Sequence, residues 1–255
     1  MLDLMQLSQL VDPVRCRATA ASELGSIGFV DRSARFVLGR LGMESLLEGG
    51  APISRYRDFS RVSRWQWIDK QATSFLEKYP NGQGIEVDGG LSTRFHRISE
   101  LLSWPRFSWK TINTHDVVDC IQYVFPQLDN CSNVACGSPV SEWTKNVCWQ
   151  EKLMRIAIIG EQKPIAKWQA FTTICKDIEK KLREESPEFH LILSHSVENF
   201  QARLEQSSLN VRIYSQMPAV IYKRSKLLNL FNRILSVNKK NQIQCHYLVV
   251  STSKE

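Results

Sequence analysis

Short apolar runs alternate with helix-like stretches from Gly84 onward, and this alternation constrains the fold more than any other feature of the chain. The apolar runs are Ile85–Val87, Phe107–Ile112, Asn133–Ala135, Leu153–Ile159, His190–Leu193, Val211–Tyr214 and Tyr247–Val250. The helix-like stretches are Thr93–Leu102, Asp116–Phe125, Pro164–Arg183, Val197–Glu205 and Val220–Leu235. Strands that alternate with helices form a mostly parallel sheet with helices on both faces. The sequence therefore predicts an α/β fold, a doubly wound seven-stranded sheet that is mostly parallel.

The first 80 residues are predicted to form a helical flank or lid on a core that spans 81–255. Apolar spacing predicts helices over 34–47, ended by Gly49-Gly50, and over 62–79, ended by Pro80. The second helix carries a wide aromatic and aliphatic face formed by Trp65, Ile68, Ala72, Phe75, Leu76 and Tyr79. No linker rich in Gly, Ser or Pro separates the two parts, so we expect a single domain over 1–255.

Composition narrows the class of protein. The 255 residues are 43% hydrophobic and 23% charged, which excludes a largely disordered chain. No apolar run approaches the roughly 20 residues of a membrane-spanning helix, and the first residues lack a basic leader. The seven cysteines form no C-x-x-C pair, and Cys131, Cys136 and Cys148 lack the paired spacing of a zinc site. We expect a cytoplasmic protein without a metal.

The first strand–helix turn is the expected ligand site, because ligands bind at the carboxyl ends of the strands in a doubly wound sheet. Gly89 and Gly90 allow the backbone to pass close to a nucleotide, and Glu86 is expected to point its carboxylate into the crevice. Taken alone, two glycines after a strand are as compatible with an ordinary tight turn.

Five sequence blocks in a fixed order resemble the leucine carboxyl methyltransferase-like family, which includes protein-phosphatase carboxyl methyltransferases and polyketide-type O-methyltransferases. The turn Ile85–Arg97 (IEVDGGLSTRFHR) is similar to the family's first motif. The other blocks are Arg64–Asp69, Trp109–Val117, Gly137–Trp143 and Arg155–Glu161. The resemblance covers about residues 60–195. It implies a Rossmann-like class I methyltransferase that uses S-adenosylmethionine as cofactor.

The resemblance also implies roles for particular residues. Arg64 matches the arginine that binds the methionine carboxylate of the cofactor, as a bidentate contact. Glu86 matches an acid near the amino-acid end, Gly90 the glycine that approaches the cofactor, and Glu161 an acid lining the pocket. Thr93 and Arg94 match the tail of the first motif, and Arg94 has a structural alternative, which is to tie the helix start to a neighbouring carboxylate.

Four positions depart from the family's motifs, and one of them is Gln162, which replaces the glycine after Glu161. Asp88 replaces the first glycine of the turn, while Thr111 and Asn113 stand where the family has Glu and Asp. An asparagine accepts through a single oxygen, so the bidentate ribose acceptor is lost. Asp88 is a candidate to replace part of the missing acid. The cofactor-binding candidates are Arg64, Glu86, Asp88, Gly89, Gly90, Thr111, Asn113 and Glu161.

The sequence supports two functions. The leading one is an O-methyltransferase that acts on a small-molecule or carboxylate acceptor, and the alternative is an inactive methyltransferase-fold binding or scaffold protein. A carboxylate acceptor needs no base, whereas a phenol or alcohol needs one, for which His96 and His115 are the nearest candidates. No catalytic residue is assigned.

The basic excess of +7 lies near the C-terminus. No Asp or Glu occurs from Gln206 through Lys254, and the positive residues there are Arg212, Lys223, Arg224, Lys226, Arg233, Lys239, Lys240 and Lys254. This segment is either a solvated face of a sheet-covering helix or a surface for an acidic or carrier-bound substrate or partner. Nucleic acid is the less favoured partner, because no aromatic stacking pattern accompanies the charges.

Overall fold

The computed structural model describes residues 3–47, 55–149, 153–159, 176, 178, 180, 188–193, 209–217 and 245–252. Glu161 and Gln162 therefore lie outside the described residues. So do the expected helices Val197–Glu205 and Val220–Leu235, most of Pro164–Arg183, and most of the basic C-terminal segment.

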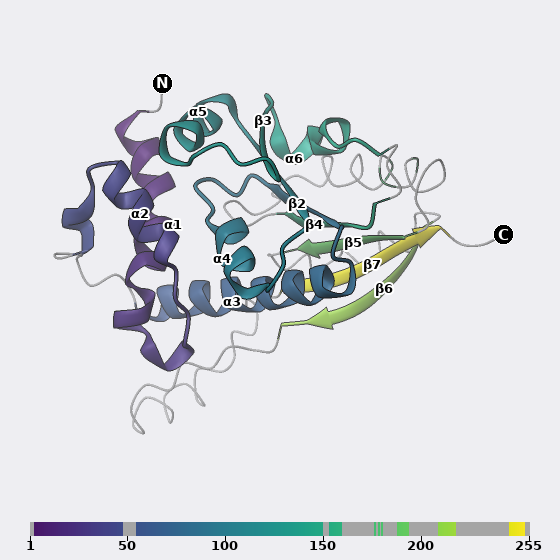
Figure 1. Ribbon diagram of the computed structural model, residues 1–255, viewed down its shortest axis with the longest axis horizontal. Coiled ribbons are helices and arrows are strands. Elements are labelled where there is room, and N and C mark those ends of the chain that lie inside the picture. The colour runs from purple at the N-terminus through teal and green to yellow at the C-terminus, as the bar shows by residue number, and fades with distance from the viewer. Residues whose placement is uncertain are drawn as a thin grey trace, which may run out of the picture.

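Seven strands form one sheet in the order β3-β2-β1-β4-β5-β7-β6 (Figure 1). Their bounds are β1 Gln83–Val87, β2 Ser108–Asn113, β3 Cys131–Ala135, β4 Arg155–Ile159, β5 Glu188–Leu193, β6 Leu209–Gln216 and β7 His246–Thr252. β1 pairs in parallel with β2 and β4, whereas β7 runs antiparallel to both β5 and β6. The predicted seven-stranded, mostly parallel sheet is confirmed, and each expected strand overlaps an observed one.

Apolar clusters pack on both faces of the sheet, because alternate residues of each strand point to opposite sides. On one face, α3 (Arg55–Lys78) and α4 (Arg94–Leu101) cover a cluster that includes Trp109, Ile156 and Ile158. On the other, Trp143 and Trp149 pack against residues of β1, β4 and β5, next to the short helix α6 (Pro139–Glu142) and the 3-10 turn Trp143–Asn146. α5 (His115–Val124) follows β2.

The N-terminal part adds α1 (Leu4–Glu23) and α2 (Arg32–Arg40), which pack on each other and on α5. The prediction of one helix over 34–47 is wrong. The helix ends at Arg40, Gly42 adopts a φ of 67°, and a separate 3-10 turn spans Glu44–Leu47. A left-handed residue cannot continue an α-helix, and glycine adopts that conformation at low cost. The helix predicted over 62–79 begins earlier, at Arg55.

Gly84 leaves the space that Trp109 fills. The two residues are register partners on β1 and β2, and both are buried. A Cβ placed on Gly84 would lie 2.0 Å from Cε3 of the Trp109 indole. The glycine is therefore required by packing against its neighbour strand.

No helix among the described residues is long and apolar enough to cross a membrane.

Candidate functional site

The turn Asp88-Gly89-Gly90 directly follows β1, and we call it the glycine turn. It lies where the strand order changes direction. β1 has β2 on one side and β4 on the other, and the chain moves outward in both directions from β1, so the crevice opens beyond the carboxyl end of β1. Asp88 has a φ of 54° and Gly90 a φ of 61°. Among the described residues, Asp88 is the one non-glycine residue in the left-handed region. Such conformations concentrate at functional sites and are tolerated best by Asn, Asp and Gly.

β2 fixes the turn from the side. The Asp88 N–H donates to the Ile112 carbonyl at 2.8 Å, and the Gly90 N–H donates to Oδ1 of Asn113 at 3.0 Å. Asn113 is fully buried, and its Nδ2 has no hydrogen-bond partner among the described residues. Its acceptor is thus used to hold the turn, and only its N–H donors remain for a ligand.

Glu86 lies in a buried cluster, whereas the sequence predicts that it points into the crevice. Its side chain is 1% exposed, and its Oε1 accepts hydrogen bonds from the Ser92 hydroxyl and the Arg94 guanidinium. The carboxylate also underlies the turn, because a Cβ on Gly89 would lie 2.8 Å from Glu86 Cγ. Glu86 therefore supports the turn from below.

Arg94 takes the structural role that the sequence left open. Its side chain is fully buried, and its Nε donates to Oδ1 of Asp69 at 2.7 Å. Arg97, one turn further along α4, donates to Oδ2 of the same Asp69 at 2.7 Å. Arg94 thus joins Glu86 of β1 to Asp69 of α3, and Arg97 adds a second bond from α4 to Asp69.

The remaining candidate residues separate. Thr111 donates to Oδ1 of Asn133 on β3 at 2.5 Å, and both line an internal cavity of about 30 Å³ together with Glu86 and His96. Arg64 is buried on α3, the helix that carries Asp69. Glu86, Asp88, Gly89, Gly90 and Asn113 come together at the turn, whereas Thr111 lies two residues earlier on β2 and bonds Asn133 of β3.

The two histidines differ in their surroundings. The His96 ring stacks on Phe125 with centroids 4.9 Å apart, and burial lowers the pKa of His96 below its ordinary value. His115 is exposed at the first position of α5, two residues after Asn113. His96 is therefore a packing residue, and His115 is the histidine at the carboxyl edge of the sheet.

Comparison with family models and with curated proteins finds no match for the chain. Among solved structures, the chain is similar to the CurJ carbon methyltransferase, at 11% identity over 96% of this chain and 68% of that one, with a TM-score of 0.49. It is also similar to the plantazolicin methyltransferase BpumL in complex with SAH (13% identity, 97% and 99% covered, TM-score 0.41). A third is a precorrin-6y C5,15-methyltransferase from Geobacter metallireducens (10%, 73% and 89%, 0.41). With scores this low, the fold assignment rests on the chain's own strand order and register.

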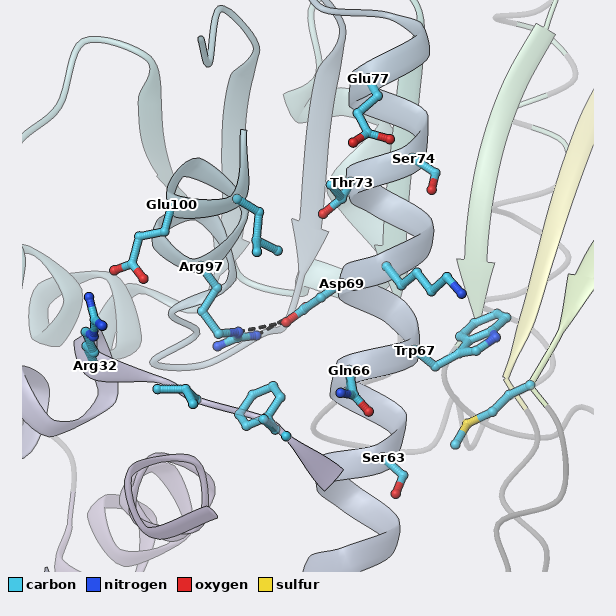
Figure 2. A pocket seen from close by; sticks show the side chains of 16 residues that line it. Arg32, Ser63, Gln66, Trp67, Asp69, Thr73, Ser74, Glu77, Arg97 and Glu100 are labelled. Carbon is cyan, nitrogen blue, oxygen red and sulfur yellow. Dashed lines mark hydrogen bonds and ion pairs between the residues drawn. The ribbon is translucent and has the colours of Figure 1, made fainter. Parts of the chain in front are cut away.

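A larger cavity, of about 1080 Å³, runs along the outer face of α3 (Figure 2). The side chains labelled in Figure 2 line the cavity with hydroxyl, amide and charged groups. The Asp69–Arg97 ion pair lies at the centre of this view. Glu86, the two glycines and Asn113 are absent from the described lining. The described lining of the cavity is therefore separate from the residues of the glycine turn.

Asp31 bonds Arg97 in the same buried cluster of ion pairs as Asp69, and this role was not predicted from the sequence. It caps α2 by accepting from the Ala34 N–H at 2.9 Å, and its side chain is fully buried. An Asp three residues before an apolar helical position is a capping signal that could have been found, but its distant partners could not. Burial opposes ionisation of Asp31, yet Arg97, Arg17 and hydrogen bonds from Thr93 and Ala34 outweigh it and hold its pKa below the ordinary 3.8.

We expect Asp31→Asn to make the free energy of unfolding less dependent on pH below about pH 5. Because the pKa of Asp31 is lowered in the folded state, the unfolded chain binds this proton more readily. The stabilisation is therefore complete above the unfolded pKa and is lost as pH falls through the folded one. Urea unfolding between about pH 5 and pH 3 measures the slope. A wild-type slope in the variant would contradict the assignment, and Asp12, whose pKa is also lowered, keeps the slope from vanishing.

Proposed function

We propose that the chain is an S-adenosylmethionine-dependent O-methyltransferase that acts on a small-molecule or carboxylate acceptor. The observation that carries the proposal is the glycine turn at the switch point of the sheet, which the Gly90 to Asn113 hydrogen bond ties to β2. The resemblance of five ordered blocks supports the same function. We also propose that the protein works in the cytoplasm and that its acceptor is not a nucleic acid.

The residues at the turn fit a nucleoside cofactor in part. The left-handed backbone at Asp88 and Gly90 turns the chain sharply after β1, as a close backbone approach to a ligand requires. Asn113 Nδ2 is a buried donor without a hydrogen-bond partner among the described residues, and we expect a ribose hydroxyl to accept from it. The acidic ribose grip of the family is replaced by a donor. When bound, S-adenosylmethionine supplies an electrophilic methyl group with its own leaving group.

The chain's own task is then to orient the acceptor and exclude water. A carboxylate acceptor is ionised at neutral pH and needs no base from the protein. For a phenol or alcohol, His115 is the better-placed histidine, because it is exposed at the start of α5 while His96 is packed on Phe125.

Calorimetry with S-adenosylhomocysteine tests the proposal directly. We expect saturable binding to the folded chain, and mass spectrometry of the purified protein under native conditions is expected to detect a bound nucleoside. A folded protein that gives no heat at millimolar ligand would refute cofactor binding. Methyl transfer is then measured with labelled S-adenosylmethionine and a panel of small carboxylates and phenols.

We expect Asn113→Asp to tighten S-adenosylhomocysteine binding. Aspartate keeps an oxygen for the Gly90 N–H and adds a charged acceptor for the ribose hydroxyls. A hydrogen bond to a charged group contributes about 1.5–3 kcal/mol, or roughly 10- to 150-fold in affinity. Thr111→Val is the matched control on the same strand, because Thr111 bonds Asn133 inside the sheet, and it should leave the affinity unchanged. Weaker or equal binding by Asn113→Asp would contradict a ribose at this position.

The second candidate function is a methyltransferase-fold binding or scaffold protein that has lost the cofactor. The observation that favours it is the use of Asn113 Oδ1 within the protein, which leaves no acidic acceptor at the end of β2. Failure of both the wild type and Asn113→Asp to bind would favour this candidate, whereas nucleoside that copurifies with the protein would exclude it.

A further inference from the structure

Thr93 is the N-cap of α4, yet its hydroxyl does not cap the helix. Instead, Thr93 Oγ1 donates to Oδ2 of Asp31 at 2.5 Å and accepts from the Arg97 guanidinium at 2.6 Å. A threonine at an N-cap ordinarily satisfies a backbone N–H of its own helix. This one, fully buried, joins Asp31 of the N-terminal flank to Arg97 of its own helix.

Asp31 gathers these contacts from the N-terminal flank. Arg97 donates to its Oδ2 at 2.6 Å, and Arg17 of α1 lies 3.4 Å from the same oxygen. Arg17 also donates to the carbonyl of Leu91 at 2.7 Å, one residue beyond Gly90. Two bonded routes therefore connect the flank to the glycine turn, one through Leu91 and one through Thr93.

Both routes consist of buried side chains. Asp31 is fully buried, and the side chains of Arg17 and Arg97 are 2% and 7% exposed. Arg17 lies over the Trp65 ring and Arg97 over the Phe29 ring, each 5.1 Å from the centroid. In such surroundings hydrogen bonds to charged groups are strong, and a missing partner is costly. The buried hydrogen bonds of Asp31, Thr93, Arg17 and Arg97 thus join the flank to the turn, and loss of one of them is expected to weaken this attachment.

We propose that Asp31 and Thr93 are positioning residues for the ligand-binding turn, so that docking of the α1–α2 flank and cofactor affinity are coupled. This inference rests on the proposed function for the identity of the ligand. Because coupling free energies are reciprocal, a ligand that orders the turn also strengthens the attachment of α1. Neither residue is expected to touch the ligand itself.

The test uses the full chain and a matched pair at one position. Thr93→Val keeps the shape of the side chain but removes the hydroxyl, while Thr93→Ser keeps the hydroxyl. Without ligand, we expect amide hydrogen exchange over 89–93 to be about tenfold faster in Thr93→Val and near wild type in Thr93→Ser. Asn130→Ala is the control, because Asn130 bonds the Phe107 carbonyl beside the amino ends of β2 and β3, at the opposite edge of the sheet from the turn and not on the flank.

Binding gives the second readout. S-adenosylhomocysteine affinity should fall about tenfold in Thr93→Val and stay within a few-fold in Thr93→Ser and Asn130→Ala. Saturating ligand should protect α1 amides in the wild type and less so in Thr93→Val. Equal exchange at the turn in all variants would overturn the coupling. If the wild type binds no ligand, the proposed function fails, and the exchange comparison still decides the positioning role. If Thr93→Val does not fold, Thr93→Ser against Thr93→Ala replaces the pair.

Discussion

Replacing Arg94 by methionine is expected to lower the free energy of unfolding by about 3–5 kcal/mol, because it removes a buried cation that bonds two buried carboxylates. The Arg94 side chain is fully buried and bonds both Glu86 and Asp69. Asp69 retains Arg97, whereas Glu86 loses the guanidinium that bonds its Oε1. Since Glu86 underlies the glycine turn, the turn should loosen together with the fold.

Urea unfolding at pH 7 measures this loss, and Arg57→Met is the control. Arg57 is 53% exposed and lies 3.6 Å from Asp12, so its removal should change the free energy by less than about 0.5 kcal/mol. Arg94→Lys should fall between the two, because an ammonium keeps the charge but not the fork that reaches two carboxylates. A loss under about 1 kcal/mol in Arg94→Met would show that the buried pairs contribute no net stability.

The fold followed from local pattern because each strand and its flanking turns are written in consecutive residues. Ile85–Val87 and Leu153–Ile159 are apolar runs bounded by polar or glycine residues, and both are central strands. The helix break at Gly42 was missed because the apolar spacing continues through it, and spacing reports which face is buried rather than whether the backbone turns.

The place of the turn in the fold was predictable, whereas its contacts were not. The alternation of strands and helices is enough to put Asp88, Gly89 and Gly90 directly after the first strand, where the structure has them. The use of Asn113 as an anchor for Gly90, and of Asp31 as the centre of a buried ion network, depends on residues 23 and 62 positions away from their partners. One sequence without its relatives carries no signal for such pairs, because a buried Asp and a surface Asp are written alike.

The pair Gly84 and Trp109 should show strong energetic coupling. Gly84→Ala places a Cβ 2.0 Å from the Trp109 ring in the centre of the sheet, where neither strand can move without breaking its ladder. Overpacking of this kind costs about 1–3 kcal/mol and occasionally more. Trp109→Leu removes the six-membered ring that Gly84→Ala meets, at a cost of about 3–5 kcal/mol for the lost burial and the cavity.

In the double variant, the alanine methyl occupies space that the indole has vacated. We therefore expect the double variant to be more stable than the sum of the two single losses predicts, with a coupling of about 0.5–3 kcal/mol. Urea unfolding of the four proteins closes the cycle. Gly82→Ala offers no such relief in the Trp109→Leu background, since a Cβ there meets the Tyr79 and Met154 carbonyls instead, so its loss should simply add. Additivity of Gly84→Ala and Trp109→Leu would contradict the contact, because it would show that the neighbouring ring plays no part in the loss caused by Gly84→Ala.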